Sequence, residues 1–289
     1  MTDIVYALAA CGDTAFSASS TGLLRSLDAG RTWSPVRLDS GLVIPASAVV
    51  FSPQFPADQI VFAAVPGGIL RSLDGGNVWA SAQLPTPAPF ITSMAVSPDF
   101  EHDRILFAAS LEDGVYRSID GGANWASWNF GLLDFQVLSL VIAPGDTLYA
   151  GTGTGLFVSQ NAGRAWIETT LPCGHSPILC LASAPGLLLV GTEGSGLYAS
   201  LDASQSWQQL GNDKTQESIN ALIMDGNMII AAMQDVLIIS RDAGQTWDRV
   251  LGLPEDDLPS QLAAPYGLAP GAVLLVGCSS GHLCRIVLI

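Results

Sequence analysis

Basic residues are scarce in this sequence. Of its 289 residues only 11 are Lys or Arg, against 26 Asp and Glu, and the formal net charge is −15. Proteins bind nucleic acid largely through Lys and Arg contacts to phosphate, and anionic membrane surfaces attract the same positive charges. We therefore expect no nucleic-acid partner and no attachment to an anionic membrane surface.

Long apolar runs are missing as well. No stretch of about 18 or more apolar residues occurs, so no transmembrane helix and no direct membrane insertion are expected. The segment Leu8-Ala9-Ala10-Cys11 resembles a bacterial lipobox. However, residues 1–7 contain Asp3 and no Lys or Arg, and the apolar stretch is too short for an export signal. We expect Cys11 to carry no lipid and the protein to be cytoplasmic.

Paired cysteine motifs are also absent. The five cysteines form an odd set without a CxxC pair, which predicts reduced and mostly buried thiols. Cys173-Gly-His175 with Cys180 offers potential zinc ligands, but the spacing matches no standard site and a fourth ligand is missing. Because no EF-hand loop, P-loop or GxGxxG pattern occurs either, we expect no metal and no cofactor.

What the chain does have is an internal repeat. Six eight-residue segments begin with Ser, have Asp or Asn third and end with Trp, and five of them have Gly fifth. Successive repeat tryptophans are 46, 46, 41, 41 and 40 positions apart, which is the period of a four-stranded propeller blade. The repeated positions are Asp28 and Trp33, Asp74 and Trp79, Asp120 and Trp125, Asn161 and Trp166, Asp202 and Trp207, and Asp242 and Trp247.

The residue types of the repeat suit a tight hairpin turn. Asp, Asn and Ser bond to nearby backbone, Gly accepts a positive φ, and the Trp ring can fold over the turn. The pattern resembles the Asp-box (BNR) repeat of sialidases, sortilin-type receptors, some endoglucanases and photosystem II assembly factors. The resemblance implies a β-propeller in which the repeat residues are structural and lie on the face opposite the binding site.

Short apolar runs between the repeats supply the remaining strands. We predict an all-β single propeller over residues 1–289, with seven blades at about 1–40, 41–86, 87–133, 134–172, 173–213, 214–253 and 254–289. Six blades are full, and the seventh has only three strands, at about 261–265, 272–277 and 282–289. The run Leu283–Ile289 would then be an exposed apolar edge open to pairing with another chain. Matching inserts at 52–58 and 97–103 are expected to be structural turns.

Known propeller enzymes provide two alternatives. Sialidase needs an Arg-Ile-Pro motif and a converged arginine triad, but here Ile44-Pro45 follows Val43, and Arg25, Arg71 and Arg117 recur at one repeat position. A glycosidase needs only two carboxylates flanking a cleft. The sequence pairs no two of the acids expected in the loops, namely Glu112, Asp113, Asp134, Glu193, Asp235, Glu255, Asp256 and Asp257.

One loop stands outside the repeat. Trp128 and Phe130 precede Leu132-Leu133-Asp134-Phe135 on the connection from blade three to blade four. If exposed, this cluster beside acidic residues would be a protein-binding surface, and if buried it would belong to the core. We expect a non-enzymatic scaffold that binds a protein or peptide, with the acidic loops favouring a basic partner. The alternative is a glycan-active protein, either a carboxylate-pair hydrolase or a lectin-like binder.

Overall fold

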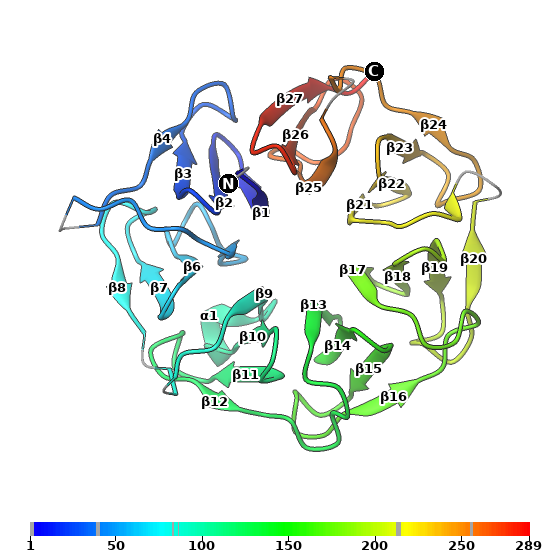
Figure 1. Cartoon of the computed structure of the whole chain (residues 1–289), viewed down its shortest axis with the longest axis horizontal. Coiled ribbons are helices and arrows are strands. Elements are labelled where there is room, and N and C mark those ends of the chain that lie inside the picture. Colours follow the sequence, from blue (N-terminus) through cyan, green and yellow to red (C-terminus); the bar gives the residue numbers. More distant parts are fainter. Residues whose placement is uncertain (1–2, 39–40, 83, 86, 212–214, 255–256) are drawn as a thin grey trace.

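The computed structural model describes residues 3–38, 41–82, 84–85, 87–211, 215–254 and 257–289. It is an all-β propeller whose seven antiparallel sheets surround a central axis (Figure 1). Each sheet follows chain order, with its first strand next to the axis and its last strand on the outer rim. The predicted seven-bladed architecture is confirmed. No described helix is long and apolar enough to cross a membrane.

The strands of the first four sheets have the following bounds. They are β1 (Val5–Cys11), β2 (Thr14–Ser19), β3 (Leu23–Ser26) and β4 (Ser34–Pro35), then β5 (Ala48–Phe51), β6 (Val61–Val65), β7 (Gly68–Ser72) and β8 (Ala80–Ser81). The third and fourth sheets contain β9 (Ile91–Val96), β10 (Leu106–Ser110), β11 (Val115–Ser118) and β12 (Ala126–Ser127), then β13 (Val137–Ala143), β14 (Thr147–Thr152), β15 (Leu156–Ser159) and β16 (Ile167–Thr169).

The last three sheets complete the ring. They contain β17 (Ile178–Ala184), β18 (Leu187–Thr192), β19 (Leu197–Ser200) and β20 (Gln208–Leu210), then β21 (Ala221–Asp225), β22 (Met228–Ala232), β23 (Leu237–Ser240) and β24 (Asp248–Arg249), and finally β25 (Pro259–Ala263), β26 (Val273–Cys278) and β27 (Leu283–Val287). The seventh sheet thus has three described strands, as expected. Its first strand begins two residues before the predicted position, and its pairing with β26 shifts register between Pro259 and Gln261.

The repeats form the turns between the third and fourth strands, and we call them the repeat turns. In the first, Ser26 Oγ donates to Asp28 Oδ1 at 2.7 Å and accepts from the Gly30 N–H at 2.9 Å. The same carboxylate oxygen accepts from the Thr32 N–H at 2.8 Å. Equivalent sets of three bonds recur in the other five turns, including the one built on Asn161. The Ser and Asp positions are therefore occupied in closing their own turns.

Adjacent blades are coupled by an aromatic side chain on the second strand. Phe16, Phe62 and Phe107 are almost completely buried. Each lies against a glycine in the repeat turn of the next blade, so that a Cβ at Gly76 would be 2.5 Å from the Phe16 ring. The glycine is required there for its positive φ and for this close approach.

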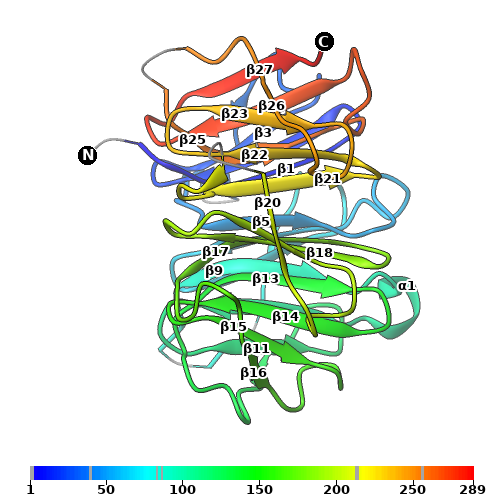
Figure 2. The same ribbon diagram turned by 90° about the vertical axis from the view of Figure 1, so that its right-hand side faces the viewer.

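One predicted turn differs from expectation. The insert at 97–103 contains a single helical turn, α1 (Phe100–Asp103), which lies on the side of the ring away from the N-terminus (Figure 2). Phe100 is buried and meets Phe62 edge-on, with ring centroids 5.9 Å apart. Ser97 Oγ donates to Asp103 at 2.5 Å, just as Ser52 Oγ donates to Asp58 at 2.5 Å in the other insert.

The ring closes by contacts between the first and last sheets. The Gly12 N–H donates to the Pro265 carbonyl at 2.9 Å, and Ser260 Oγ donates to the Val5 carbonyl at 3.1 Å. In the described residues, β1 and β25 pack side by side and neither strand joins the other's sheet.

Candidate functional site

The described lining of the axial channel is uncharged. A cavity of about 220 Å³ lies among the first strands of the sheets. Its polar lining includes Thr92, Ser93, Asn220 and Gln261, and none of the described residues around it is Asp, Glu, Lys or Arg. A carboxylate pair for glycoside hydrolysis is therefore missing from the described channel wall.

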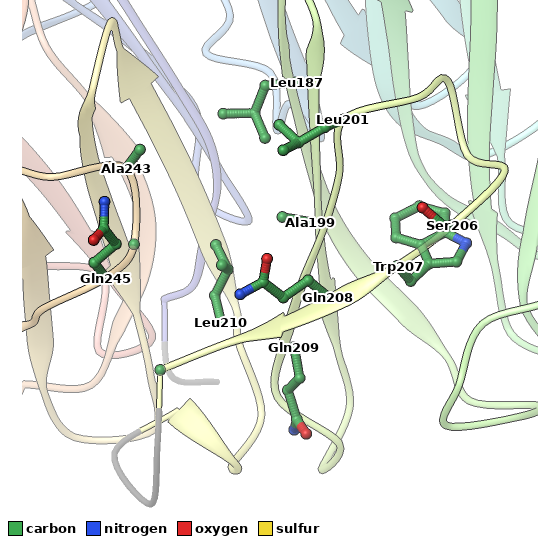
Figure 3. A pocket seen from close by; sticks show the side chains of 12 residues that line it. Leu187, Ala199, Leu201, Ser206, Trp207, Gln208, Gln209, Leu210, Ala243 and Gln245 are labelled. Atoms are coloured by element: carbon green, nitrogen blue, oxygen red, sulfur yellow. The ribbon is translucent and has the colours of Figure 1, made fainter.

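A larger cavity of about 600 Å³ opens between blades five and six. Gln208 on β20 and Gln245 in the sixth repeat turn lie on facing sides of it, with Leu210 between them (Figure 3). Trp207 also lines the pocket, and its indole N–H is buried without a hydrogen-bond partner among the described residues. The described lining is uncharged. Such a mixture of apolar and amide groups suits a neutral polar ligand.

The connection 128–136, which we call the apolar segment, lies on the face opposite the repeat turns and is held by blade four. The Trp166 backbone N–H donates to the Phe130 carbonyl at 2.9 Å, and its indole N–H donates to the Trp128 carbonyl at 2.8 Å. Gly131 has φ +83° and passes so close that a Cβ there would lie 2.3 Å from the Trp166 carbonyl oxygen. Leu132 is buried in the core between blades three and four.

Blade three holds the same segment from the other side. The Trp128 N–H donates to the Val115 carbonyl at 2.8 Å, and the Trp128 ring stacks on the Arg117 guanidinium at 4.4 Å. Asn129 accepts from the Val115 N–H at 2.7 Å and donates to the Asp113 carbonyl at 2.8 Å. Trp128 is consequently half-buried and belongs to the support of the segment. Of the two outcomes left open for this cluster, Trp128 is half-buried, whereas Phe130 is exposed.

Three large apolar side chains of the segment face solvent. Phe130 is 80% exposed, Leu133 is 79% exposed and Phe135 is 46% exposed. Their backbone is fixed, since the Gly114 N–H donates to the Phe135 carbonyl at 3.0 Å. A segment that is anchored at several points and yet exposes such side chains has the character of an interaction site.

Acidic side chains lie on the neighbouring turn. Glu112 and Asp113 are both exposed, and the Leu111 N–H of this turn donates to the carbonyl of Phe90, which is 53% exposed. Asp134, by contrast, has a structural part, because its carboxylate accepts from the Gln136 N–H at 2.9 Å and from Thr154 Oγ1 at 3.0 Å.

The remaining predicted acids divide into three cases. Glu193 and Asp235 are exposed on the second-to-third-strand turns of blades five and six, and neither has a described contact with another predicted acid. Glu255 and Asp256 lie outside the described residues. Asp257 lies in a loop, as expected, but it is only 5% exposed. It is turned inward by Ser280 Oγ, which donates to it at 2.6 Å, and by His282 Nδ1 at 2.9 Å.

The edge strand β27 pairs with β26 and with no other described strand. Val287 is 51% exposed and Ile289 is 89% exposed, whereas Ile286 and Leu288 are buried. Arg241 donates to the Ile289 carbonyl at 2.5 Å. The outer side of this strand is thus only partly covered in the described residues.

These features define the class of protein, a seven-bladed β-propeller with an exposed apolar segment between two blades. No protein-family model and no curated protein matches the sequence. Solved structures do match. YCF48 bound to D1 peptide is 18% identical, with a TM-score of 0.77 over 100% of this chain and 94% of that chain. YCF48 from Cyanidioschyzon merolae is 16% identical, with a TM-score of 0.74 over 99% and 96%.

A glycoside hydrolase is similar as well. The GH74 xyloglucanase from Xanthomonas campestris is 19% identical, with a TM-score of 0.72 over 98% of this chain and 52% of that chain. At these identities the likeness shows a shared propeller fold and carries no information about a shared activity.

Proposed function

We propose that this protein is a non-enzymatic scaffold that binds a protein or peptide through the apolar segment 128–136. The observation that carries this proposal is the exposure of Phe130, Leu133 and Phe135 on a backbone fixed from both sides. Because the free protein already orders these groups, binding has little conformational entropy to lose. Peptide binding by a propeller of this shape has a precedent in the YCF48 structure bound to D1 peptide.

The charge around the segment suggests the chemistry of the partner. Glu112 and Asp113 flank the apolar side chains, and the whole chain has a net charge of −15. We therefore propose a basic partner that places Lys or Arg beside apolar residues, since complementary charge favours both encounter and register.

The repeat turns fit the same proposal. We infer that they are Asp-box (BNR) repeats, because all six contain the same three hydrogen bonds. The Ser hydroxyl donates to the Asp or Asn side-chain oxygen, and the hydroxyl and that oxygen each accept a backbone N–H. Side chains that close their own turns are unavailable for a ligand, which leaves the opposite face as the binding face.

Co-purification from the native cells tests the proposal. Wild-type protein would be compared with Phe130→Ser/Leu133→Ser and with the matched control Leu27→Ser/Ile119→Ser. The control removes side chains that are 61% and 66% exposed in the repeat turns. We expect a stoichiometric partner with the wild type and the control, and its loss with the first variant. A partner that survives Phe130→Ser/Leu133→Ser, or no partner at all, would contradict the proposal.

The β27 edge is a second proposed contact. An extended segment of a partner can add its backbone to an incomplete sheet, and β27 has one described neighbour. Hydrogen exchange of the β27 amides in the presence of the captured partner tests this contact. Protection on binding is the expected result, and unchanged exchange in a stoichiometric complex would eliminate edge pairing.

Glycan binding is the second candidate function, favoured by the uncharged pocket between blades five and six. Gln208 and Gln245 offer amides of the kind that hold sugars. Because the lining of this pocket and that of the axial channel contain no described carboxylate, a lectin-like role suits the pocket better than hydrolysis. A glycan array with wild type and Gln208→Ala/Gln245→Ala tests this candidate, and binding that the double variant abolishes would establish it.

A further inference from the structure

Four side chains with metal-binding atoms meet in the seventh blade. Cys278 ends β26, His282 lies in the following turn and Cys284 lies on β27, while Asp257 comes from the segment before β25. The two Sγ atoms and a carboxylate oxygen of Asp257 all lie within 4.8 Å of one another.

His282 and Cys284 both face the Asp257 carboxylate. His282 Nδ1 is 2.9 Å from Oδ1 and 3.2 Å from Oδ2, and Cys284 Sγ is 3.7 Å from Oδ2. Ligands of a tetrahedral zinc ion, at Zn–S of about 2.3 Å and Zn–N or Zn–O of about 2.0 Å, are roughly 3.3–3.8 Å apart. For Asp257, Cys278 and Cys284 the observed separations are close enough that small side-chain rotations would create this geometry. His282, which contacts Asp257, would have to turn from the carboxylate toward the ion to become the fourth ligand.

The cluster is deep on one side and open on the other. Cys278 is fully buried and Asp257 is 5% exposed, whereas the His282 side chain is 71% exposed. An ion could therefore enter past the imidazole. Among the described residues no Lys or Arg pairs with the buried Asp257 carboxylate, and both cysteines are free thiols. Ser280 Oγ and His282 Nδ1 hold the carboxylate in place, facing the two thiols.

We propose that Asp257, Cys278, His282 and Cys284 form a zinc site. Two sulfur ligands with one imidazole and one carboxylate suit a borderline-soft ion such as Zn²⁺ and disfavour Mg²⁺ or Ca²⁺, which prefer all-oxygen sites. The ion would tie β26, β27 and the segment before β25 together. It would thus stabilise the blade that has three described strands where the others have four.

Metal titration of the full chain, after treatment with a chelator, tests the site. Co²⁺ serves as the spectroscopic probe, and Zn²⁺ is then added to displace it and to compete with a chromophoric indicator. We expect one ion per chain, thiolate-to-cobalt charge-transfer absorption and a higher unfolding temperature with Zn²⁺. Loss of an outer-shell partner alone weakens metal binding about 10- to 100-fold, so Cys278→Ser and Cys284→Ser should each weaken zinc binding by at least that factor.

Matched variants separate ligand loss from misfolding. His282→Gln removes an exposed ligand and should weaken binding without changing the far-UV circular dichroism. Cys11→Ser and Cys173→Ser remove half-buried thiols elsewhere and should leave binding unchanged. The site would be overturned by the absence of stoichiometric binding or by loss of binding with Cys173→Ser. It would also be overturned if the Cys278→Ser and Cys284→Ser variants bound zinc as tightly as the wild type. A thiol count of three with a mapped Cys278–Cys284 disulfide in freshly purified protein would also overturn it.

Discussion

At the scale of single residues, the contact between blades four and five departs from the other repeats. Where three other blades have Phe16, Phe62 or Phe107 on the second strand, blade four has Tyr149, which is 2% exposed. Where the other five repeat turns have Gly at the fifth position, the turn of blade five has Ser204, with φ +70°. The two exchanges belong together, because Tyr149 and Ser204 share a side-chain hydrogen bond. Burial raises the pKa of the Tyr149 hydroxyl, and this hydrogen bond lowers it.

A double-mutant cycle at this contact should show strong coupling. Ser204→Gly alone removes the strain of a left-handed non-glycine residue, which stabilises the fold by roughly 1–2 kcal/mol. The same change leaves the buried Tyr149 hydroxyl without that partner, which destabilises the fold by about 1–3 kcal/mol. Tyr149→Phe alone loses the hydrogen bond and keeps the backbone strain. We expect Tyr149→Phe/Ser204→Gly to be more stable than either single variant and than the wild type in urea unfolding. Additive single effects would contradict the pairing.

At the scale of elements, the apolar segment depends on one backbone position. Gly131 and Gly145 have nearly the same φ, +83° and +84°, but only Gly131 has a neighbour within 4 Å of its missing Cβ. Comparison of alanine at the two positions therefore separates backbone strain from the collision with Trp166.

Gly131→Ala should displace the segment and reduce partner binding. The Cβ would collide with the carbonyl oxygen of Trp166. Trp166 holds the segment, because its backbone N–H donates to Phe130 and its indole N–H donates to Trp128. Gly145→Ala should lose only about 1–2 kcal/mol of stability from the left-handed backbone and keep full binding. Calorimetric titration with the captured partner gives both affinities. Equal affinities for the two variants would show that the fixed backbone of the segment is irrelevant to binding.

At the scale of the whole molecule, the repeat turns tie stability to pH. Hydrogen bonds from the hydroxyls of Thr32, Ser206 and Thr246, followed by backbone N–H bonds, lower the pKa values of Asp28, Asp202 and Asp242 to about 2. A carboxylate whose pKa is lower in the folded than in the unfolded protein stabilises the fold above its unfolded value. That stabilisation is lost as the pH falls from about 4 to about 2.

Blade four contains a turn that cannot titrate in this way. Asn161 takes the place of the aspartate, and Ala165 takes the place of Thr32. Copying Asn and Ala into the first, fifth and sixth turns should flatten the fall in unfolding free energy between pH 4 and pH 2. Urea unfolding followed by far-UV circular dichroism measures that slope. An unchanged slope would place the acid sensitivity outside the repeat turns.

The sequence predicts the fold well because the repeat is local. Trp33 and Trp79 are 46 residues apart and belong to equivalent turns, so their spacing alone indicates a blade. The same reasoning predicts the three strands of the seventh blade. Short apolar runs such as β14 and β22 can be recognised as strands because Gly, Pro or Asp-Gly turns flank them.

The candidate sites were harder to predict, because they depend on contacts between segments that follow no repeat. Asp257 meets His282 across 25 positions, in a blade without a repeat turn, and no standard ligand spacing marks the pair. Trp128 is half-buried because Arg117 stacks on it, and nothing in the order of residues indicates that contact. Phe130 was expected to be either exposed or buried, and it is exposed. The hydrophobic pattern of a connection between blades cannot distinguish these two outcomes.

The attachment of the apolar segment to Trp166 has an optical consequence. The Trp166 indole donates to the Trp128 carbonyl, and Trp128 is the one tryptophan outside the repeats. A ligand that covers Phe130 would therefore alter the surroundings of two adjacent fluorophores, one of them stacked on a guanidinium. The protein contains its own emission probe at the proposed docking surface, and occupancy can be followed in real time without a label.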